Sequence, residues 1–304
     1  MASTERTSVG GDEEPDVGQG LPIQAVSDLL QVPAPTIRSW ERRYHVPTVS
    51  RSTGGHRRFL PVEVNALRLM RDEIARGRRP AEAAALVRAA GATVSPHQPM
   101  IDDFLQAAHR LDSWGVNASL ERARVQLGVE QAVCGVLLPA MRQIGLWWQR
   151  GQCDVAHEHL ATETARGWLN RVFYLGPSPW EPEAVVLACG PRDFHTIGLE
   201  ALGVLLAQRG WGCRLLGART PVKSLITAIE GTGAAAVVMV SHLAVVRRSA
   251  AEALRAALPT GALLFYAGNS FISPQARQGV PGIYLGEDLA AAADTVTATL
   301  ISRR

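Results

Sequence analysis

The sequence predicts a chain of three folded parts: a winged helix-turn-helix, a four-helix bundle and a doubly wound α/β domain. Apolar residues recur at helical spacing over residues 20–91 and again over 100–176. Over 182–304, short apolar runs alternate with helical stretches, which is typical of a parallel sheet with helical crossovers. With 304 residues and 47% hydrophobic content, the chain is long enough to bury the cores of several domains.

The N-terminal part begins with a segment that we do not expect to fold. Residues 1–19 contain five acidic residues and few large apolar ones, so their burial cannot offset the entropy of ordering. From Leu21 the apolar residues fall at helical spacing until Val32-Pro33, and a second helix begins near Pro35. This spacing predicts a helix-turn-helix.

The region that follows predicts a wing and two more helices. Val46 to Phe59 contains Gly54-Gly55 and indicates a short hairpin. Helical patterns then run from Val64 to about Gly77 and from Pro80 to Gly91. Residues 92–99 break the period and are expected to form a linker.

Four helical stretches joined by short loops predict an antiparallel bundle over 100–176. Their expected ranges are 102–111, 116–127, 130–148 and 155–174.

The α/β domain is indicated by short apolar runs between helical stretches, and ligands in such folds bind beyond the carboxyl ends of the strands. The expected strands are Ala184–Ala188, Cys213–Leu216, Ala234–Val240, Leu263–Tyr266 and Ile283–Leu285.

Positive charge is concentrated in the N-terminal part, although the whole chain carries a net charge of only +3. Eleven arginines stand against four acidic residues between Arg38 and Arg79. Such clusters are typical of nucleic-acid binding, because they release counterions from phosphates. A solvated helix face is the alternative, but it fits poorly with the interleaved Trp40 and Tyr44.

The helix from Pro35 and the predicted wing supply residue types that bind DNA, since arginine pairs with guanine edges or grips phosphates. The candidate DNA-binding residues are Thr36, Arg38, Trp40, Arg42, Arg43 and Tyr44 in the helix, and His56, Arg57 and Arg58 in the wing. This part resembles the MerR family of winged-helix regulators, which implies a dimer on a two-fold double-stranded operator. MerR proteins continue into a long coiled-coil helix, whereas Gly91 and Pro96 interrupt this chain, so dimer contacts must come from elsewhere.

A string of three residues after the first strand of the α/β domain can bind a transition metal. Asp193-x-His195-x-x-Gly198 offers a neutral imidazole as ligand and a carboxylate that fixes its tautomer. A lone histidine is more often structural, but here Ser241-His242-Leu243 follows the third strand and Ala267-Gly268 the fourth.

This arrangement resembles the B12-binding domains of methionine synthase, corrinoid methyltransferases and adenosylcobalamin mutases. The resemblance implies that His195 is the lower axial ligand of cobalt and that Gly198, Ser241, Leu243 and Gly268 line the pocket of the nucleotide tail, with Asp193 behind the histidine. Ala267 replaces the first of two glycines in the family pattern.

The bundle contains a candidate lid for the opposite face of such a ligand. Trp148 ends one expected helix, and Glu158 and His159 lie one turn into the next, so the three can project toward one face. An indole offers a flat contact, and a carboxylate can accept a hydrogen bond from an adenosyl group. The alternative is an ordinary bundle core, with Trp147 and Trp148 buried and Glu158 on the surface.

Taken together, the three parts resemble the CarH/LitR family of B12-dependent photoreceptor repressors from about Leu21 to Ile301. The resemblance implies an adenosylcobalamin-dependent repressor that assembles as a dimer or tetramer on DNA and is released by light. Methylcobalamin fits the large lid less well than adenosylcobalamin. Light-sensing members often carry a histidine after the lid tryptophan, where this chain has Gln149, a poor ligand for cobalt(III).

Other function classes remain as alternatives. A corrinoid carrier for methyl transfer shares the bundle and α/β domain, but the chain has no room for a substrate barrel of about 250 residues, so we do not expect an enzyme. A MerR-type regulator that is independent of light and responds to cobalamin or another ligand is the third possibility. The sequence shows no membrane span, no signal peptide and no paired cysteine motif, which predicts a cytoplasmic protein without a membrane partner.

Overall fold

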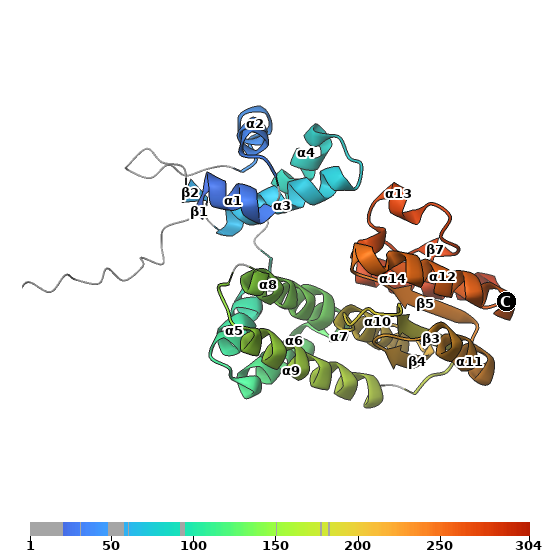
Figure 1. Cartoon of the computed structure of the whole chain (residues 1–304). Coiled ribbons are helices and arrows are strands. Elements are labelled where there is room, and N and C mark those ends of the chain that lie inside the picture. The colour runs from blue at the N-terminus through green and yellow to red at the C-terminus, as the bar shows by residue number, and fades with distance from the viewer. Residues whose placement is uncertain are drawn as a thin grey trace, which may run out of the picture. The chain divides into compact units, whose positions relative to one another are not determined.

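The computed structural model of the chain describes residues 21–30, 32–47, 58–59, 61–91, 95–149, 151–176, 178–181 and 183–304. The expected disordered segment 1–19 and the residues His56 and Arg57 of the expected wing lie outside these ranges. Residues 75–77 aside, the chain divides into two compact units, one up to residue 92 and one from residue 93 onward (Figure 1). No helix of the described residues is long and apolar enough to cross a membrane.

The N-terminal unit contains the expected helix-turn-helix. Helix α1 (Ile23–Leu30) contacts α2 (Ala34–Tyr44), and α3 (Pro61–Ala75) and α4 (Pro80–Gly91) follow. Pro35 lies in the first turn of α2, where a missing amide proton costs no hydrogen bond, and His45 ends the helix in the left-handed conformation. The unit has its own core, which includes Ile37, Phe59 and Leu67.

Most of the predicted hairpin within 46–59 lies outside the described residues, but its last two residues have a partner that the sequence did not predict. Strand β2 (Arg58–Phe59) pairs antiparallel with β1 (Leu21–Pro22), which precedes α1. The sequence could not reveal this partner, because two residues are too few to show an alternating period.

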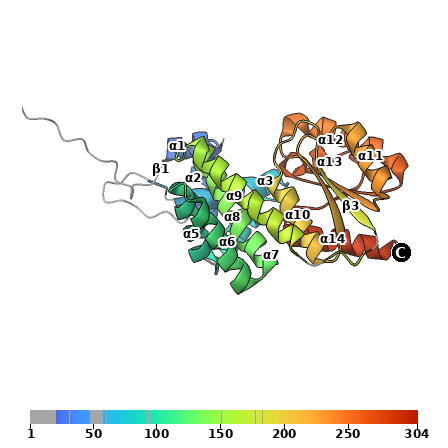
Figure 2. The same ribbon diagram turned by 90° about the horizontal axis from the view of Figure 1, so that it is seen from below.

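The second unit begins with the four-helix bundle. It consists of α5 (Gln98–His109), α6 (Ser113–Leu127), a third segment made of α7 (Val129–Gln131), a π-helix (Ala132–Leu137) and α8 (Leu138–Gln149), and finally α9 (Val155–Tyr174) (Figure 2).

Two local features differ from the expected bundle. Helix α5 begins four residues before the expected Asp102, inside the predicted linker. The third helix contains a π-turn, and such turns often occur near functional sites. A Cβ atom at Gly135 in this turn would lie 2.6 Å from Cδ2 of His97, so a larger residue would require the His97 side chain to move.

The rest of the unit is the doubly wound α/β domain, which confirms the predicted fold class. Its parallel sheet has the order β4-β3-β5-β6-β7, which reverses at the first strand of the domain. The strands are β3 (Ala184–Cys189), β4 (Gly212–Gly217), β5 (Ala236–Val240), β6 (Leu263–Ala267) and β7 (Ile283–Tyr284).

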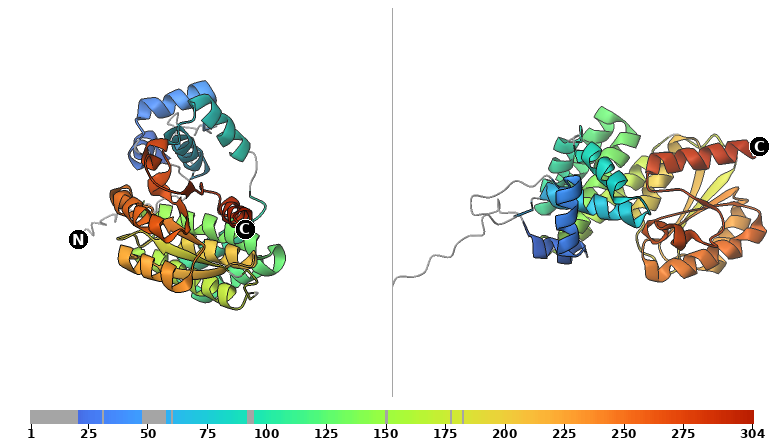
Figure 3. Two further views of the ribbon diagram at one scale, coloured as in Figure 1. Left: turned by 90° about the vertical axis from the view of Figure 1, so that its right-hand side faces the viewer. Right: turned by 90° about the horizontal axis from the view of Figure 1, so that it is seen from above.

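Helices cover both faces of this sheet (Figure 3). On one face α10 (Ile197–Gln208) and α14 (Leu289–Ser302) share a core with alternate residues of β3 and with the bundle. On the other, α11 (Val222–Thr232) and α12 (Arg247–Ala257) pack on the intervening residues. All six residues of β3 are buried, which explains its continuous apolar sequence. The remaining short helices are 244–246, 258–260, 269–271 and α13 (Pro274–Arg277).

Because bundle and sheet share one core, helix α9 packs directly on α10 (Figure 2). The loops that follow β3, β5 and β6 therefore lie in the same compact unit as the end of α8 and the start of α9.

Candidate functional site

The candidate site lies at the carboxyl edge of the sheet, where three neighbouring strands end. Strand β5 pairs with β3 on one side and with β6 on the other. The loop after β3 carries Asp193 and His195, the residues after β5 begin with Ser241 and His242, and Gly268 follows β6. The topology thus brings together residues that are 75 positions apart in the sequence.

Asp193 and His195 form the pair that the sequence predicted. Asp193 is fully buried, and its Oδ1 accepts hydrogen bonds from Nδ1 of His195 at 2.8 Å and from the backbone amide of His195 at 3.0 Å. The contact with Asp193 raises the pKa of His195, although partial burial opposes this. Since Nδ1 faces the carboxylate, Nε2 is the nitrogen left to bind a metal.

The Asp193 carboxylate is held as an anion by both histidines of the site. Burial by itself would raise its pKa, but hydrogen bonds from His195 and His242 outweigh burial and hold the pKa far below its usual value. Its Oδ2 accepts the backbone amide of His242 at 2.5 Å.

His242 is a site residue that the sequence reasoning did not select. Its Nδ1 lies 3.8 Å from Oδ2 of Asp193, and its ring centroid is 5.2 Å from that of His195. The string Ser241-His242-Leu243 was recognised for its outer residues, and the middle position has no fixed residue type in that pattern. The sequence feature that could have identified His242 is its position as a second histidine next to the carboxyl end of a central strand.

The residues expected around the nucleotide tail differ in their surroundings. Ser241 is fully buried and its Oγ has no hydrogen-bond partner in the described residues, whereas Leu243 is exposed. A Cβ atom at Gly198 would meet no atom within 4 Å, so the start of α10 faces open space. At Gly268, with φ +103°, a Cβ atom would lie 2.3 Å from the Ser241 carbonyl oxygen, so glycine is required there.

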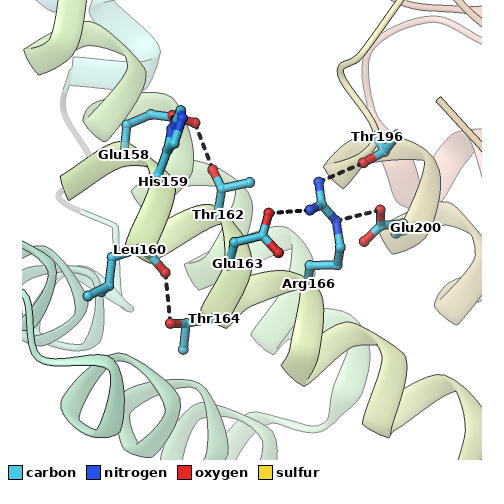
Figure 4. Close-up of polar contacts among 9 residues, drawn as sticks. All are labelled: Glu158, His159, Leu160, Thr162, Glu163, Thr164, Arg166, Thr196 and Glu200. Carbon is cyan, nitrogen blue, oxygen red and sulfur yellow. Dashed lines mark hydrogen bonds and ion pairs between the residues drawn. The ribbon is translucent and has the colours of Figure 1, made fainter. Parts of the chain in front are cut away.

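The three candidate lid residues are accessible from solvent. Trp148 is 51% exposed, which contradicts the alternative of a buried bundle core at this position. Glu158 accepts a hydrogen bond from Thr162 Oγ1 at 2.8 Å and contacts Nδ1 of His159 at 2.6 Å (Figure 4). The Glu158 charge also contributes to the raised pKa of His195, so the start of α9 acts on the sheet edge.

Arg166 connects the lid helix directly to the loop of His195. Its Nε donates to Oε1 of Glu200 at 3.1 Å and another nitrogen donates to Oγ1 of Thr196 at 3.1 Å, while Glu163 binds it within α9 (Figure 4). Glu200 is 7% exposed, and Thr196 directly follows His195. The sequence did not predict this contact, because nothing in it pairs α9 with α10.

In the N-terminal unit, α2 presents most of its candidate DNA-binding residues to solvent. Arg38, Arg42 and Arg43 are exposed, and Thr36 and Tyr44 are partly buried. Trp40 requires a correction, because it is 7% exposed and packs in the core with Ile37. Arg58 of β2 is exposed, whereas His56 and Arg57 lie outside the described residues.

Comparisons with known proteins place this geometry in a family. Residues 21–90 match the MerR HTH family of regulatory proteins, and residues 100–172 match the B12 binding domain family. The chain is 34% identical to the HTH-type transcriptional repressor CarA of Myxococcus xanthus over 67% of this chain and 70% of that protein. It is 29% identical to the HTH-type transcriptional repressor CarH of the same organism over 84% and 90% of the respective chains.

A solved structure supports the fold of the second unit. The monomethylamine corrinoid protein of Methanosarcina barkeri matches with a TM-score of 0.53 and 13% identity, over 67% of this chain and 99% of that one. At this level of identity the likeness concerns the fold alone.

The N-terminal unit and the second unit together define a DNA-binding transcriptional regulator with a B12-binding domain. More narrowly, the chain belongs to the family of HTH-type transcriptional repressors that includes CarA and CarH. These relatives are regulators, which favours the regulatory prediction over the carrier alternative.

Proposed function

We propose that this protein is an adenosylcobalamin-dependent repressor that holds the corrinoid between bundle and α/β domain and assembles on operator DNA. The observation that carries the proposal is the contact between Asp193 and His195 at the carboxyl edge of the sheet, with the Glu158 charge acting on the same imidazole. A buried carboxylate behind a half-exposed histidine is the usual support for a metal-bound imidazole.

On the sheet side, the described residues fit a corrinoid. His195 would bind cobalt through Nε2, while Asp193 holds the other ring nitrogen. The open space at Gly198 and the unpartnered buried hydroxyl of Ser241 fit a nucleotide tail with polar atoms, and Gly268 keeps the backbone of the two loops close.

On the bundle side, Trp148, Glu158 and His159 would cover the opposite face. When bound, adenosylcobalamin supplies a cobalt–carbon bond that light can break. Light-sensing members often carry a histidine where this chain has Gln149. His159 is a better candidate than His157 to supply the cobalt ligand that such a histidine would provide. His157 accepts the Asp154 amide in the capping box of α9 and stacks on His109, whereas the side chain of His159 is 72% exposed.

The DNA-binding side of the proposal rests on α2. Exposed Arg38, Arg42 and Arg43 on one helix fit the major groove of an operator. We infer that self-association to a dimer or tetramer supplies the two-fold symmetry that paired half-sites require.

The test follows absorption and mass of the purified full-length protein. It is mixed with adenosylcobalamin in darkness and then illuminated with green light. Uptake of coloured cofactor with an increase in mass, reversed by light, supports the full proposal. A colourless protein refutes cofactor binding. A coloured protein whose spectrum and mass do not change on illumination supports the light-independent regulator instead.

A second test addresses DNA. The operator is first selected from a random duplex library with the cofactor-loaded protein. Arg42→Ala should weaken binding to that duplex by about 1–3 kcal/mol and leave cobalamin uptake unchanged, because Arg42 lies in the other compact unit. Loss of both activities would instead mark Arg42 as a folding residue.

A further inference from the structure

Among the described residues, one carboxylate and two imidazoles gather at the carboxyl edge of the sheet. The possible ligand atoms of Asp193, His195 and His242 all lie within 4.8 Å of one another. They come from the loop after β3 and from the end of β5, two strands that pair directly. Their backbone positions are therefore set by the sheet.

The nitrogen Nδ1 of His242 is the least satisfied atom of this cluster. It is buried and has no hydrogen-bond partner in the described residues, and its 3.8 Å distance from Oδ2 of Asp193 is too long for a hydrogen bond. A buried polar atom without a partner costs free energy, so a native structure that keeps one calls for an explanation. A cation bound between the carboxylate and the two imidazoles would satisfy it.

We propose that Asp193, His195 and His242 bind a free divalent transition-metal ion, with Zn²⁺ as the best match, when the protein holds no corrinoid. Two imidazoles and one carboxylate are a common protein ligand set for Zn²⁺, which takes a fourth ligand to complete a tetrahedron. The 55% exposed side chain of His195 leaves access for water as that ligand.

Zinc and corrinoid would exclude each other through the tautomer of His195, an inference that rests on the proposed function. Zinc in this cluster takes the Nδ1 lone pair, so the remaining ring proton sits on Nε2. Cobalt ligation needs the opposite tautomer, with Nδ1–H donating to Asp193 and a free lone pair on Nε2. A neutral imidazole has a single ring lone pair and cannot bind both ions, so Zn²⁺ acts as an antagonist of cobalamin.

The metal site is tested on the full-length protein freed of corrinoid. Calorimetric titration with Zn²⁺ should show one equivalent bound, and Co²⁺ should give the visible absorption of a tetrahedral site. His242→Ala and His242→Gln should each weaken Zn²⁺ at least about tenfold, as expected for loss of a ligand. The glutamine variant keeps a polar side chain, which separates lost ligation from misfolding.

His109→Ala is the matched control, because the His109 ring also lies beside a second imidazole, that of His157 at 5.7 Å between centroids, but outside the proposed cluster. It should leave Zn²⁺ affinity unchanged. Equal affinity in wild type and both His242 variants, or an equal loss in His109→Ala, overturns the site.

Competition tests the exclusion separately. The apparent affinity for adenosylcobalamin should fall in proportion to added Zn²⁺ in the wild type. Cobalamin binding that is insensitive to saturating Zn²⁺ overturns the exclusion. A protein that binds Zn²⁺ at His242 but takes up no cobalamin would refute the proposed function and leave the zinc site supported.

Discussion

The sheet side and the bundle side of the candidate site are held in place by different means. Asp193 is fully buried and accepts hydrogen bonds from two loops, so His195 has a fixed orientation. Trp148 is half exposed, and within the part of the chain that the structure describes Glu158 forms hydrogen bonds only with neighbours on its own helix, Thr162 and His159. The sheet side is preorganised by tertiary contacts, while the bundle side can adjust its side chains around a ligand.

This contrast predicts that sheet-side substitutions weaken cobalamin binding more than lid substitutions. The largest effect is expected for His195→Ala, which removes the proposed cobalt ligand. Affinity for adenosylcobalamin should fall by more than about 100-fold. This exceeds the loss of about 10–100-fold that is typical when a residue that only orients a metal ligand is replaced. Equilibrium dialysis measures this, and an unchanged absorption spectrum of bound cofactor would contradict the assignment of His195.

The next effect is expected for Asp193→Asn, which keeps the shape of the side chain but removes its charge. The amide cannot hold Nδ1–H of His195 as the carboxylate does, so affinity should fall about 10–100-fold. Asp103→Asn, which alters a surface ion pair with Arg122, is the control and should change nothing measurable. Equal effects of the two variants would show that Asp193 does not position His195.

Arg166→Ala tests the contact that joins the two sides. It leaves the buried Glu200 carboxylate without the guanidinium, and Oε2 of Glu200 already has no hydrogen-bond partner in the described residues. The free energy of unfolding should fall by about 2 kcal/mol, less than the ~3–5 kcal/mol of a fully buried pair, because Arg166 is 32% exposed.

Urea denaturation measures this loss, and the double variant Arg166→Ala, Glu200→Gln supplies the control. Because the double variant also removes the unpaired Glu200 charge, it should recover part of the stability that Arg166→Ala loses. If the double variant is as unstable as the sum of both single variants, the two residues are not coupled.

The smallest effect is expected for Trp148→Ala. An exposed indole that stacks on a flat ligand contributes about 0.5–1.5 kcal/mol beyond its buried area, so affinity should fall roughly tenfold. Dialysis in darkness checks this value. A loss as large as that of His195→Ala would show that the lid is as preorganised as the sheet side.

Much of this architecture was predictable because it depends on local patterns. The apolar runs of β3 to β7 and the helical periods of the bundle reflect which residues face a core, and the motif Asp193-x-His195 lies within three residues. By contrast, the pairing of Leu21–Pro22 with Arg58–Phe59, the π-turn at Ala132–Leu137 and the burial of Trp40 depend on packing between distant segments.

The sequence by itself determined the order of the three parts, the strands that end at the site and the imidazole–carboxylate pair, because short-range spacing encodes each of them. Only the tertiary structure decided that His242 lies beside Asp193 and that Arg166 reaches Glu200 and Thr196. Those contacts join residues 49, 34 and 30 positions apart, and their distances are set by strand order and by the packing of α9 on α10. No local pattern records such distances, since the intervening chain can take many paths between the same two side chains.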